Sequence, residues 1–307
     1  MDHTSTSPAA PAAPAAAGAR RTRRRLLVAG GAVLVVLVAV VVIWRLAGGG
    51  DLQRIAGAAD ATLAAGSARV AVVATVEGVP ILGPFMLTVA EGELDLAEQQ
   101  AHLRREVSAV SGIPLLNRLL PEAVEILHDG TQAYMRLPVG GEQAWVRLGE
   151  AVEGSDGPAI AAPGLTNPAA ALALLRVLDG VPEVLGEEVV RGQDSTSFRV
   201  VVNLERAAEV LSGRAEDVAR GLRRLRGRNT LPMVVWLDGD DRVTRLRYAV
   251  EPDLAGQSVT VVTDLELFDF GIPVDIRAPS PDELATLPTD RLQGLDPFAW
   301  LQRLLDL

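Results

Sequence analysis

The pattern of apolar and polar positions divides the chain into an apolar run and a long region with a strand-like period. The run Leu26–Ile43 holds eighteen residues without a charge. Helical residues rise about 1.5 Å each, so the run spans about 27 Å, close to the hydrocarbon thickness of a bilayer. From Ser67 onward, apolar residues recur mainly at every second position, which is typical of half-buried strands. The pattern predicts a transmembrane helix over 26–44, followed by a folded region rich in strands.

Basic residues flank the apolar run unequally. Five arginines lie between positions 20 and 25, whereas only Arg45 closely follows the run. The positive-inside rule then places the N-terminus in the cytoplasm and the main domain outside it. A cleaved signal peptide is the alternative, but this run is longer than the 7–15-residue apolar core of a signal peptide. We therefore expect a single-pass protein of the cell membrane with an extracytoplasmic main domain.

The strand-like region predicts one long antiparallel sheet interrupted by helices. Asp51 is placed to cap a helix over 52–65 that Gly66 ends. Asn167 and Pro168 begin a second helix, and a third is expected near 204–211. The strands that we expect are Ala68–Glu77, Phe85–Ala90, Gly92–Leu96, Ala101–Val107, Val124–His128, Gln132–Leu137, Trp145–Leu148, Val184–Val190, Thr196–Asn203, Met233–Leu237, Val243–Val250 and Ser258–Phe268.

Two Asp-Gly pairs mark tight turns between strands. Asp129-Gly130 is a dipeptide that accepts the positive φ values of a hairpin turn. The acidic stretch Asp238–Asp241 has the oxygen ligands of a calcium site but lacks the spacing of a twelve-residue calcium loop, so we expect a plain hairpin there. The clean alternation of Arg245–Tyr248 predicts a strand with one wet and one covered face.

The composition along the chain predicts five segments. Residues 1–25 are an Ala- and Pro-rich tail with the arginine cluster, expected to be disordered in the cytoplasm. The transmembrane helix over 26–44, a linker over 45–50, the main domain over 51–280 and an extension over 281–307 follow. In the extension, Asp296–Leu305 predicts a short amphipathic helix that docks on its own domain, closes a cavity, or lies on a membrane or partner.

Several kinds of chemistry lack their usual residues. The chain has no cysteine, which excludes disulfides, thiolate nucleophiles and cysteine metal sites. Only His102 and His128 lie in the main domain, and we expect each at a solvated strand end rather than on a metal. Neither a Gly-x-Ser-x-Gly elbow nor a phosphate-binding loop with lysine occurs. We expect no enzyme, no metal and no cofactor.

The charge of the main domain argues against nucleic acid as a partner. Residues 51–307 hold 23 arginines and 38 acidic residues, a formal charge of −15, which repels phosphate backbones and disfavours broad adhesion to anionic membranes. Against this background, Arg220–Arg228 contains five arginines, either a solvated helix face paired with nearby acids or a docking site for anionic lipid or a partner. All 29 basic residues of the chain are arginine, which is typical of a GC-rich genome such as that of an actinobacterium.

Two apolar connectors and the order of several segments bear on function. Pro80–Met86 and Ile113–Leu120 are apolar where loops are expected, so the core or a ligand must cover them. The order of segments over about 51–280 resembles the LppX and LprG type of mycobacterial lipoproteins, a family of LolA-like lipid carriers. The matching segments are Ser67–Val70 leading to Gly78, Glu91–Leu94, Asp129–Tyr134, Trp145, Asn167-Pro168, Gly192–Thr196, Leu231–Asp238 and Phe270–Val274.

The resemblance implies an α+β fold, a strongly curved antiparallel half-barrel whose concave face is covered by helices around a hydrophobic cavity. It implies binding or transfer of acylated lipids or glycolipids in the cell envelope, with an envelope transporter as a partner. Gly49 stands where the lipidated cysteine of the family would follow Leu46-Ala47-Gly48, so the apolar run serves as the anchor. We expect the cavity to be lined by Val72, Phe85, Leu94, Leu115, Leu119, Ile126, Tyr134, Trp145, Phe198, Trp236, Leu246 and Val261.

A different class of protein remains open as the alternative. A sensor or scaffold ectodomain would use the same fold with a filled core to bind a protein partner and would carry no lipid. Lipid that purifies with the main domain separates the two hypotheses.

Overall fold

The computed structural model describes residues 50–78, 84–106, 123–139, 142–148, 171–251, 253–254 and 257–286. They belong to one compact unit, residues 49–307, which is divided from residues 1–48. The predicted tail, transmembrane helix and C-terminal amphipathic helix lie outside the described residues. Within the described ranges, no helix has both the length and the apolar character needed to cross a bilayer.

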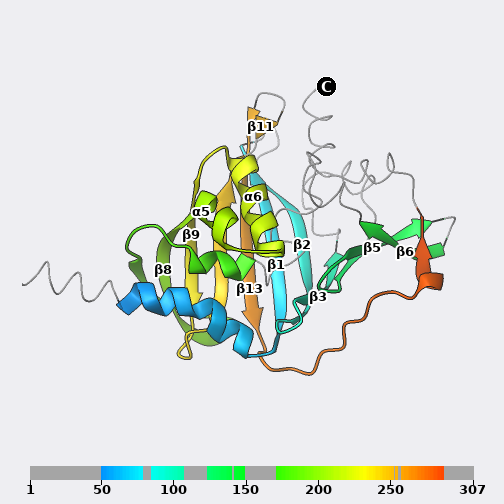
Figure 1. The fold of residues 1–307 in the computed structure, drawn as a ribbon, viewed down its shortest axis with the longest axis horizontal. Helices are drawn as coiled ribbons and strands as arrows, with labels where there is room; N and C mark the ends of the chain where they lie inside the picture. Colours follow the sequence, from blue (N-terminus) through cyan, green and yellow to red (C-terminus); the bar gives the residue numbers. More distant parts are fainter. Residues whose placement is uncertain are drawn as a thin grey trace, which may run out of the picture. The chain divides into compact units, whose positions relative to one another are not determined.

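One sheet holds most of the described strands (Figure 1). Twelve strands pair in the order β14-β6-β5-β4-β3-β2-β1-β13-β10-β9-β8-β7, and β11 and β12 form a separate hairpin. Every pairing in the sheet is antiparallel except that of β14 with β6. The strands are β1 (Ser67–Glu77), β2 (Phe85–Asp95), β3 (Gln100–Glu106), β4 (Ala123–His128), β5 (Ala133–Val139), β6 (Glu142–Leu148), β7 (Glu183–Val190), β8 (Gln193–Asn203), β9 (Thr230–Leu237), β10 (Val243–Val250), β11 (Asp253–Leu254), β12 (Gln257–Ser258), β13 (Thr260–Phe268) and β14 (Leu284–Ala285).

The sheet consists of two meanders that meet at its centre. Strands β1 to β6 follow one another along the chain, and so do β7 to β10 before the small hairpin leads to β13. The meanders join where β1 pairs with β13, from Arg69 opposite Phe268 to Glu77 opposite Thr260. The described sheet therefore ends at β7 on one side and at β14 on the other. The antiparallel sheet with a few helices agrees with the predicted fold class.

The strand register separates the side chains into two faces. Val70 and Val72 of β1 lie opposite Leu267 and Leu265 of β13, and all four are buried. Their neighbours along each strand point to the other side. The inner face is the one that carries these buried residues and receives the helices, and the outer face is the opposite one.

A helix over residues 50–64 begins the unit and packs on the inner face. Ile55 is fully buried within the main apolar core. The hydroxyl of Thr62 donates to the backbone oxygen of Ala58 at 2.6 Å and accepts from the backbone N–H of Val243 at 2.8 Å, which ties the helix to β10. The helix ends before Gly66, whose φ of 78° suits glycine, as the sequence predicts.

Two further helices lie over the strands of the second meander. The α5 helix (Leu204–Val210) begins after Asn203, whose side chain accepts from the backbone N–H of Arg206 at 2.9 Å. The α6 helix (Arg214–Arg226) ends at Gly227, which has a left-handed φ of 62°. The contacts of α5 and α6 with the sheet concentrate on β8, β9 and β10 (Figure 1). This part of the inner face is therefore a packed helix-on-sheet core.

Short 3-10 turns complete the described elements. The η2 turn (Ala173–Arg176) buries Leu174 and Leu175 in the main core, and η3 (Pro281–Glu283) precedes β14. The helix predicted after Asn167 is thus described only at its end, where residues 171–172 are helical and η2 continues them.

The two predicted hairpin turns are confirmed. A side-chain oxygen of Asp129 accepts from the backbone N–H groups of Thr131 at 2.9 Å and Gln132 at 2.7 Å. In the same way, Asp238 accepts from the backbone N–H groups of Asp240 at 3.0 Å and Arg242 at 2.9 Å. Both aspartates therefore use their oxygens to close a turn, which supports a hairpin rather than a cation loop at Asp238.

Two sequence-based expectations are wrong in detail. The predicted break between Ala90 and Gly92 does not exist, because β2 runs unbroken and Gly92 pairs with Val70 on one side and Leu103 on the other. His128 is not solvated, since it is only 2% exposed and its Nδ1 accepts from the backbone N–H of Gly130 at 3.1 Å. Its role is to support the turn that follows β4.

Candidate functional site

The inner face gathers half of the residues that the sequence assigns to an apolar cavity. Five of them are at most 2% exposed and lie in one core that the helices share, and Ile126 is partly buried against it. These residues come from strands of both meanders, so the fold brings together positions far apart in the sequence. They are Val72 of β1, Leu94 of β2, Ile126 of β4, Phe198 of β8, Leu246 of β10 and Val261 of β13.

Three predicted lining residues, all aromatic, lie on the outer face. Trp236 stands opposite Ser197 and Arg245, while its neighbour Val235 lies opposite Leu246 of the inner face. Tyr134 and Trp145 alternate in the same way with the buried Met135 and Val146. These aromatic rings therefore cannot line a site on the inner face.

Each outer aromatic ring has an arginine beside it. The guanidinium carbon of Arg245 lies 4.8 Å from the centre of the Trp236 ring, and that of Arg136 lies 5.9 Å from the Trp145 ring. The indole N–H of Trp236 also donates to Glu188 at 2.8 Å. Stacking and hydrogen bonding explain why large rings are stable on a face that is otherwise polar.

The remaining predicted lining residues are not fully described. Phe85 pairs in register with Val76 through its backbone. Leu115 and Leu119 lie in the connector between β3 and β4, outside the described residues.

A second apolar group on the inner face was not among the predicted site residues. It lies on β5 and β6, and Ile126 and Ala285 pack against it. We name it the wing cluster, and its five buried members are Ala133, Met135, Leu137, Val146 and Leu148. The recurrence of apolar residues at Ala133, Met135 and Leu137 could have indicated this face of β5 in the sequence. The prediction instead took the adjacent Tyr134, which lies on the opposite face, as a lining residue.

The wing cluster is separate from the helix-covered core. Five strands stand between β5 and β10, the strand that α6 contacts. Among the described residues, Ile126 packs both against the main core and against the wing cluster. The inner face thus carries buried apolar residues from the helix-covered strands β8 to β10 as far as β5 and β6.

Two buried polar groups interrupt the main core on the inner face. Tyr248 is 5% exposed, and burial raises the pKa of its hydroxyl to about 12. Thr263 lies opposite it on β13 and is 2% exposed. Interaction between the two side chains acts in the opposite direction and lowers the pKa of Tyr248, so burial is the larger effect.

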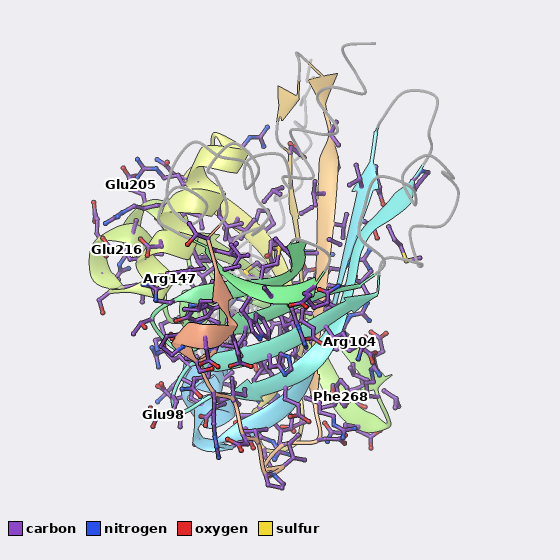
Figure 2. All side chains as sticks on the ribbon, turned by 90° about the vertical axis from the view of Figure 1, so that its right-hand side faces the viewer. Glu98, Arg104, Arg147, Glu205, Glu216 and Phe268 are labelled. Carbon is purple, nitrogen blue, oxygen red and sulfur yellow. The ribbon has the colours of Figure 1, made fainter. Side chains whose placement is uncertain are left out.

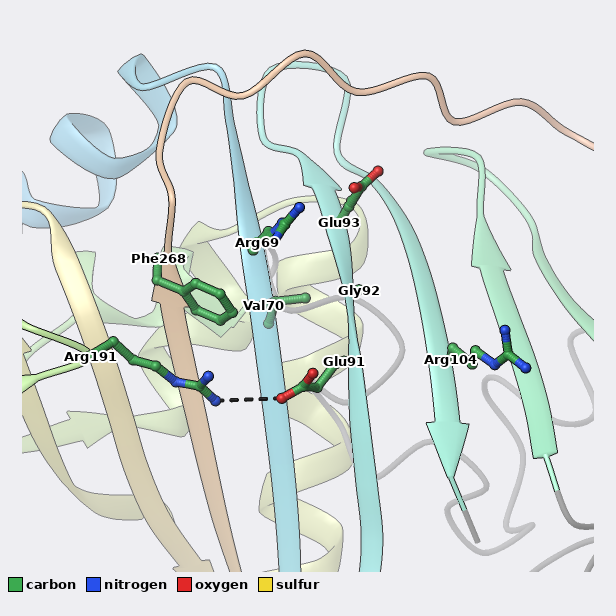
Figure 3. Close-up of a pocket in the computed structure, with 8 residues that line it drawn as sticks. All are labelled: Arg69, Val70, Glu91, Gly92, Glu93, Arg104, Arg191 and Phe268. Carbon is green, nitrogen blue, oxygen red and sulfur yellow. Dashed lines mark ion pairs between the residues drawn. The ribbon is translucent and has the colours of Figure 1, made fainter.

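The outer face holds a polar cleft of about 650 Å³ between β1, β2, β3 and β13 (Figure 3). Arg191 spans it, 2.7 Å from a carboxylate oxygen of Glu266 and 3.6 Å from one of Glu91. Its guanidinium carbon also lies 4.5 Å from the centre of the Phe268 ring. The ion pair with Glu266 is the main reason that the pKa of Arg191 is raised. The full lining is Arg69, Val70, Glu91, Gly92, Glu93, Arg104, Arg191 and Phe268.

Within the described ranges, no three histidine or acidic side chains come together in a way that could hold a metal ion. The chemistry that the described residues offer is therefore apolar contact on the inner face and mixed ionic contact in the outer cleft.

Several solved structures are similar to this chain at low sequence identity. No family model matches the sequence, and no curated protein matches it. The lipoprotein LppX of Mycobacterium tuberculosis is 18% identical, with 74% of this chain and 97% of LppX covered and a TM-score of 0.43. LprF of Mycobacterium bovis is 17% identical, with 75% and 96% covered and a TM-score of 0.42.

A more distant similarity is to a putative outer membrane lipoprotein-sorting protein domain of Vibrio parahaemolyticus, 10% identical with a TM-score of 0.29, covering 73% of this chain and 93% of that domain.

Proposed function

We propose that this protein is anchored in the cell membrane by Leu26–Ile43 and binds acylated lipids or glycolipids outside the cytoplasm, through the inner face of its sheet. The single observation that carries the proposal is the wing cluster. It extends the apolar inner face beyond the strands on which α5 and α6 pack. Acyl chains lying on β4 to β6 would complete the apolar surface that these strands present.

The energy of such binding needs no catalytic group. Burial of an acyl chain contributes about 0.8 kcal/mol per methylene. About twenty methylenes then contribute about 16 kcal/mol, which offsets the roughly 4–15 kcal/mol that association costs. We therefore propose a binding or transfer protein rather than an enzyme, and the membrane anchor restricts any transfer to acceptors within reach of the domain.

Native mass spectrometry of residues 49–307, exported and purified without detergent, tests the lipid proposal. We expect a fraction of the protein to carry a mass of acyl lipid that organic extraction removes. Val146→Trp, which fills the wing cluster, should lower that fraction several-fold. The matched control is Arg147→Trp on the exposed outer side of the same strand, which should leave the fraction unchanged.

Protease protection tests the anchor separately. In sealed cells, external protease should digest the domain and spare a tag on the N-terminus, because the arginine cluster keeps that end inside. Release of the domain by alkaline extraction would contradict anchoring and leave the lipid proposal intact.

The outer cleft favours a second candidate, a domain that binds a protein partner. Its arginines and glutamates would suit an extended peptide of mixed charge. Lipid-free protein in the mass spectrum, together with loss of a cross-linked partner in Arg104→Glu, would favour this candidate over lipid binding.

A further inference from the structure

The α6 helix divides its side chains between the core and the solvent. Ala219 and Leu222 are at most 1% exposed and belong to the main core. Arg220 and Arg223 of the same helix are exposed to solvent. The apolar side of α6 is thus buried in the domain. Its acidic residues, Glu216 and Asp217, lie in the first turn, whereas these exposed arginines lie farther along the helix.

The segment over residues 204–229, which contains α6, has a net charge opposite in sign to that of the whole domain. Residues 204–229 hold seven arginines and four acidic residues, a formal charge of +3, within a domain of −15. The imbalance grows toward the end of α6, because residues 218–229 contain five arginines and no acidic residue. Cations stabilise a helix C-terminus only within its last turn, and Arg228 lies beyond the end of α6 at Arg226.

Among the arginines of α6 whose side chains the structure describes, Arg220 pairs with acidic residues of the helix. Arg220 forms ion pairs with Glu216 and Asp217 of the preceding turn. Arg223 and Arg228 are exposed and make no ion pair with a described residue. Figure 2 shows Glu205 near Glu216 of α6. The side-chain amide of Asn229 donates a hydrogen bond to the carboxylate of Glu205 at 2.9 Å.

We infer that the basic end of α6, marked by Arg223 and Arg228, docks on the anionic head groups of the bilayer that anchors the protein. The inference rests on the anchoring in the proposed function and adds the surface that faces the membrane. The net negative charge of the domain does not prevent such docking, because charges more than about 8 Å apart are largely screened at physiological salt.

The short segment between the membrane anchor and the domain allows a weak contact between α6 and the membrane to be sufficient for docking. Six residues separate Ile43 from Gly50, and they span at most about 22 Å. A domain held so close meets the surface at an effective concentration of millimolar order. Each arginine near an anionic surface then shifts the ratio of docked to undocked domains roughly fivefold.

The test uses the full chain, reconstituted in vesicles, with one fluorophore beside the basic end. Because the chain has no cysteine, Asn229→Cys gives a single labelling site. The vesicles contain phosphatidylcholine alone or with about 30% phosphatidylglycerol, plus a trace of lipid with a quencher on its head group. We expect stronger quenching in the anionic vesicles, and about 0.5 M salt should return it to the phosphatidylcholine level.

Two charge-reversal variants of equal net charge locate the effect. Arg223→Glu with Arg228→Glu should lower the docked-to-undocked ratio at least about tenfold. Arg199→Glu with Arg277→Glu, also exposed arginines, should change it less than twofold. Circular dichroism checks that both variants are folded.

Equal quenching in the two kinds of vesicle would overturn the inference, and so would an equal loss in both variants. An acidic protein as the true partner of α6 would give the first of these results. Flotation of the same vesicles reports anchoring independently. Vesicles that float with the protein but show no dependence on anionic lipid refute the docking alone, and protein that fails to float refutes the anchor and the docking together.

Discussion

At the residue scale, Gly92 is needed because β2 and β3 approach closely there. A Cβ atom built on Gly92 would lie 1.9 Å from the backbone oxygen of His102. Backbone cannot move aside as a flexible side chain can, so the strands would have to separate. We predict that Gly92→Ala lowers the free energy of unfolding by about 3 kcal/mol or more, measured by urea denaturation.

The matched substitution for Gly92 is Gly57→Ala in the helix over 50–64. Nothing lies within 4 Å of a Cβ built there. Alanine also favours the helical state over glycine, so the free energy of unfolding should rise by about 0.5–1 kcal/mol. A similar loss in both variants would show that the contact with His102 is not what requires glycine at position 92.

Ionisation of Tyr248 makes the free energy of unfolding depend on pH in the alkaline range. Burial raises the pKa of its hydroxyl to about 12 in the folded state, against about 10 in the unfolded chain. Because the folded pKa is the higher one, this contribution to stability is complete below about pH 10 and is lost as the pH rises through 12. In that window we predict a fall of about 1.4 kcal/mol in unfolding free energy per pH unit.

The chain contains two tyrosines, which makes the titration of Tyr248 simple to isolate. Burial, followed by the hydrogen bond to Asp129, also raises the pKa of Tyr134, so we remove that residue as Tyr134→Phe. Absorbance of tyrosinate at alkaline pH should then appear only near pH 12. A transition near pH 10 in the folded variant would show that Tyr248 is reached by solvent.

At the element scale, turns and helix ends could be predicted from the sequence, but the facing of several strands could not. Asp129-Gly130 and Gly66 act through local backbone geometry, which neighbouring residues alone determine. By contrast, Met233–Leu237 is apolar at nearly every position, so it has no period from which to read a face. Trp236 lies outside because Arg245 and Glu188 stabilise its ring there, and these partners come from other strands.

The ionic cluster on β10 follows from this arrangement of the outer face. Arg245 is 21% exposed, lies 2.7 Å from Asp264 and faces the carboxylates of Glu266 at 3.9 Å and Glu188 at 4.0 Å. Removing the cation leaves three carboxylates close together. We predict that Arg245→Leu lowers the unfolding free energy by about 1–3 kcal/mol at neutral pH, measured by urea denaturation.

Arg247 serves as the comparison for Arg245 on the same strand. It is 49% exposed and approaches Asp264 only at 3.5 Å. An exposed pair of this kind contributes little, so Arg247→Leu should change the unfolding free energy by about 0.5 kcal/mol or less. If the two leucine variants lost equal stability, the stacking of Arg245 on Trp236 and its central place in the cluster would have no energetic weight.

At the scale of the whole molecule, the sequence could predict one antiparallel sheet with an apolar face, but not how that face is divided. The main core and the wing cluster are separated by sheet order, which depends on β1 pairing with β13, nearly two hundred residues apart along the chain. Local patterns carry no information about such a pairing. For this reason, the predicted site included Phe198 and Leu246, which the helices cover, and omitted Met135 and Val146.

This division predicts two levels of stability within one sheet. The main core packs helices against β8, β9 and β10, whereas the described wing cluster has five buried members near the β14 edge. Fewer buried contacts lower the free energy of local opening. In hydrogen exchange, we therefore predict that the amides of β9 and β13 exchange slowest, and that those of β5 and β6 exchange by local opening at lower free energy.

Acyl lipid that binds at the wing should slow exchange in β5 and β6 as well as in strands that exchange only when the whole domain unfolds. A ligand that binds only the closed state stabilises it by an amount that grows with ligand concentration, about 2.7 kcal/mol at a hundred times the dissociation constant. Adding a short-chain acyl lipid should thus slow exchange in β5 and β6, and Val146→Trp should abolish the slowing. Because β9 opens only with the whole domain, slowing confined to β9 would place the lipid in the helix-covered core instead, and identical exchange with and without lipid would contradict binding on the inner face.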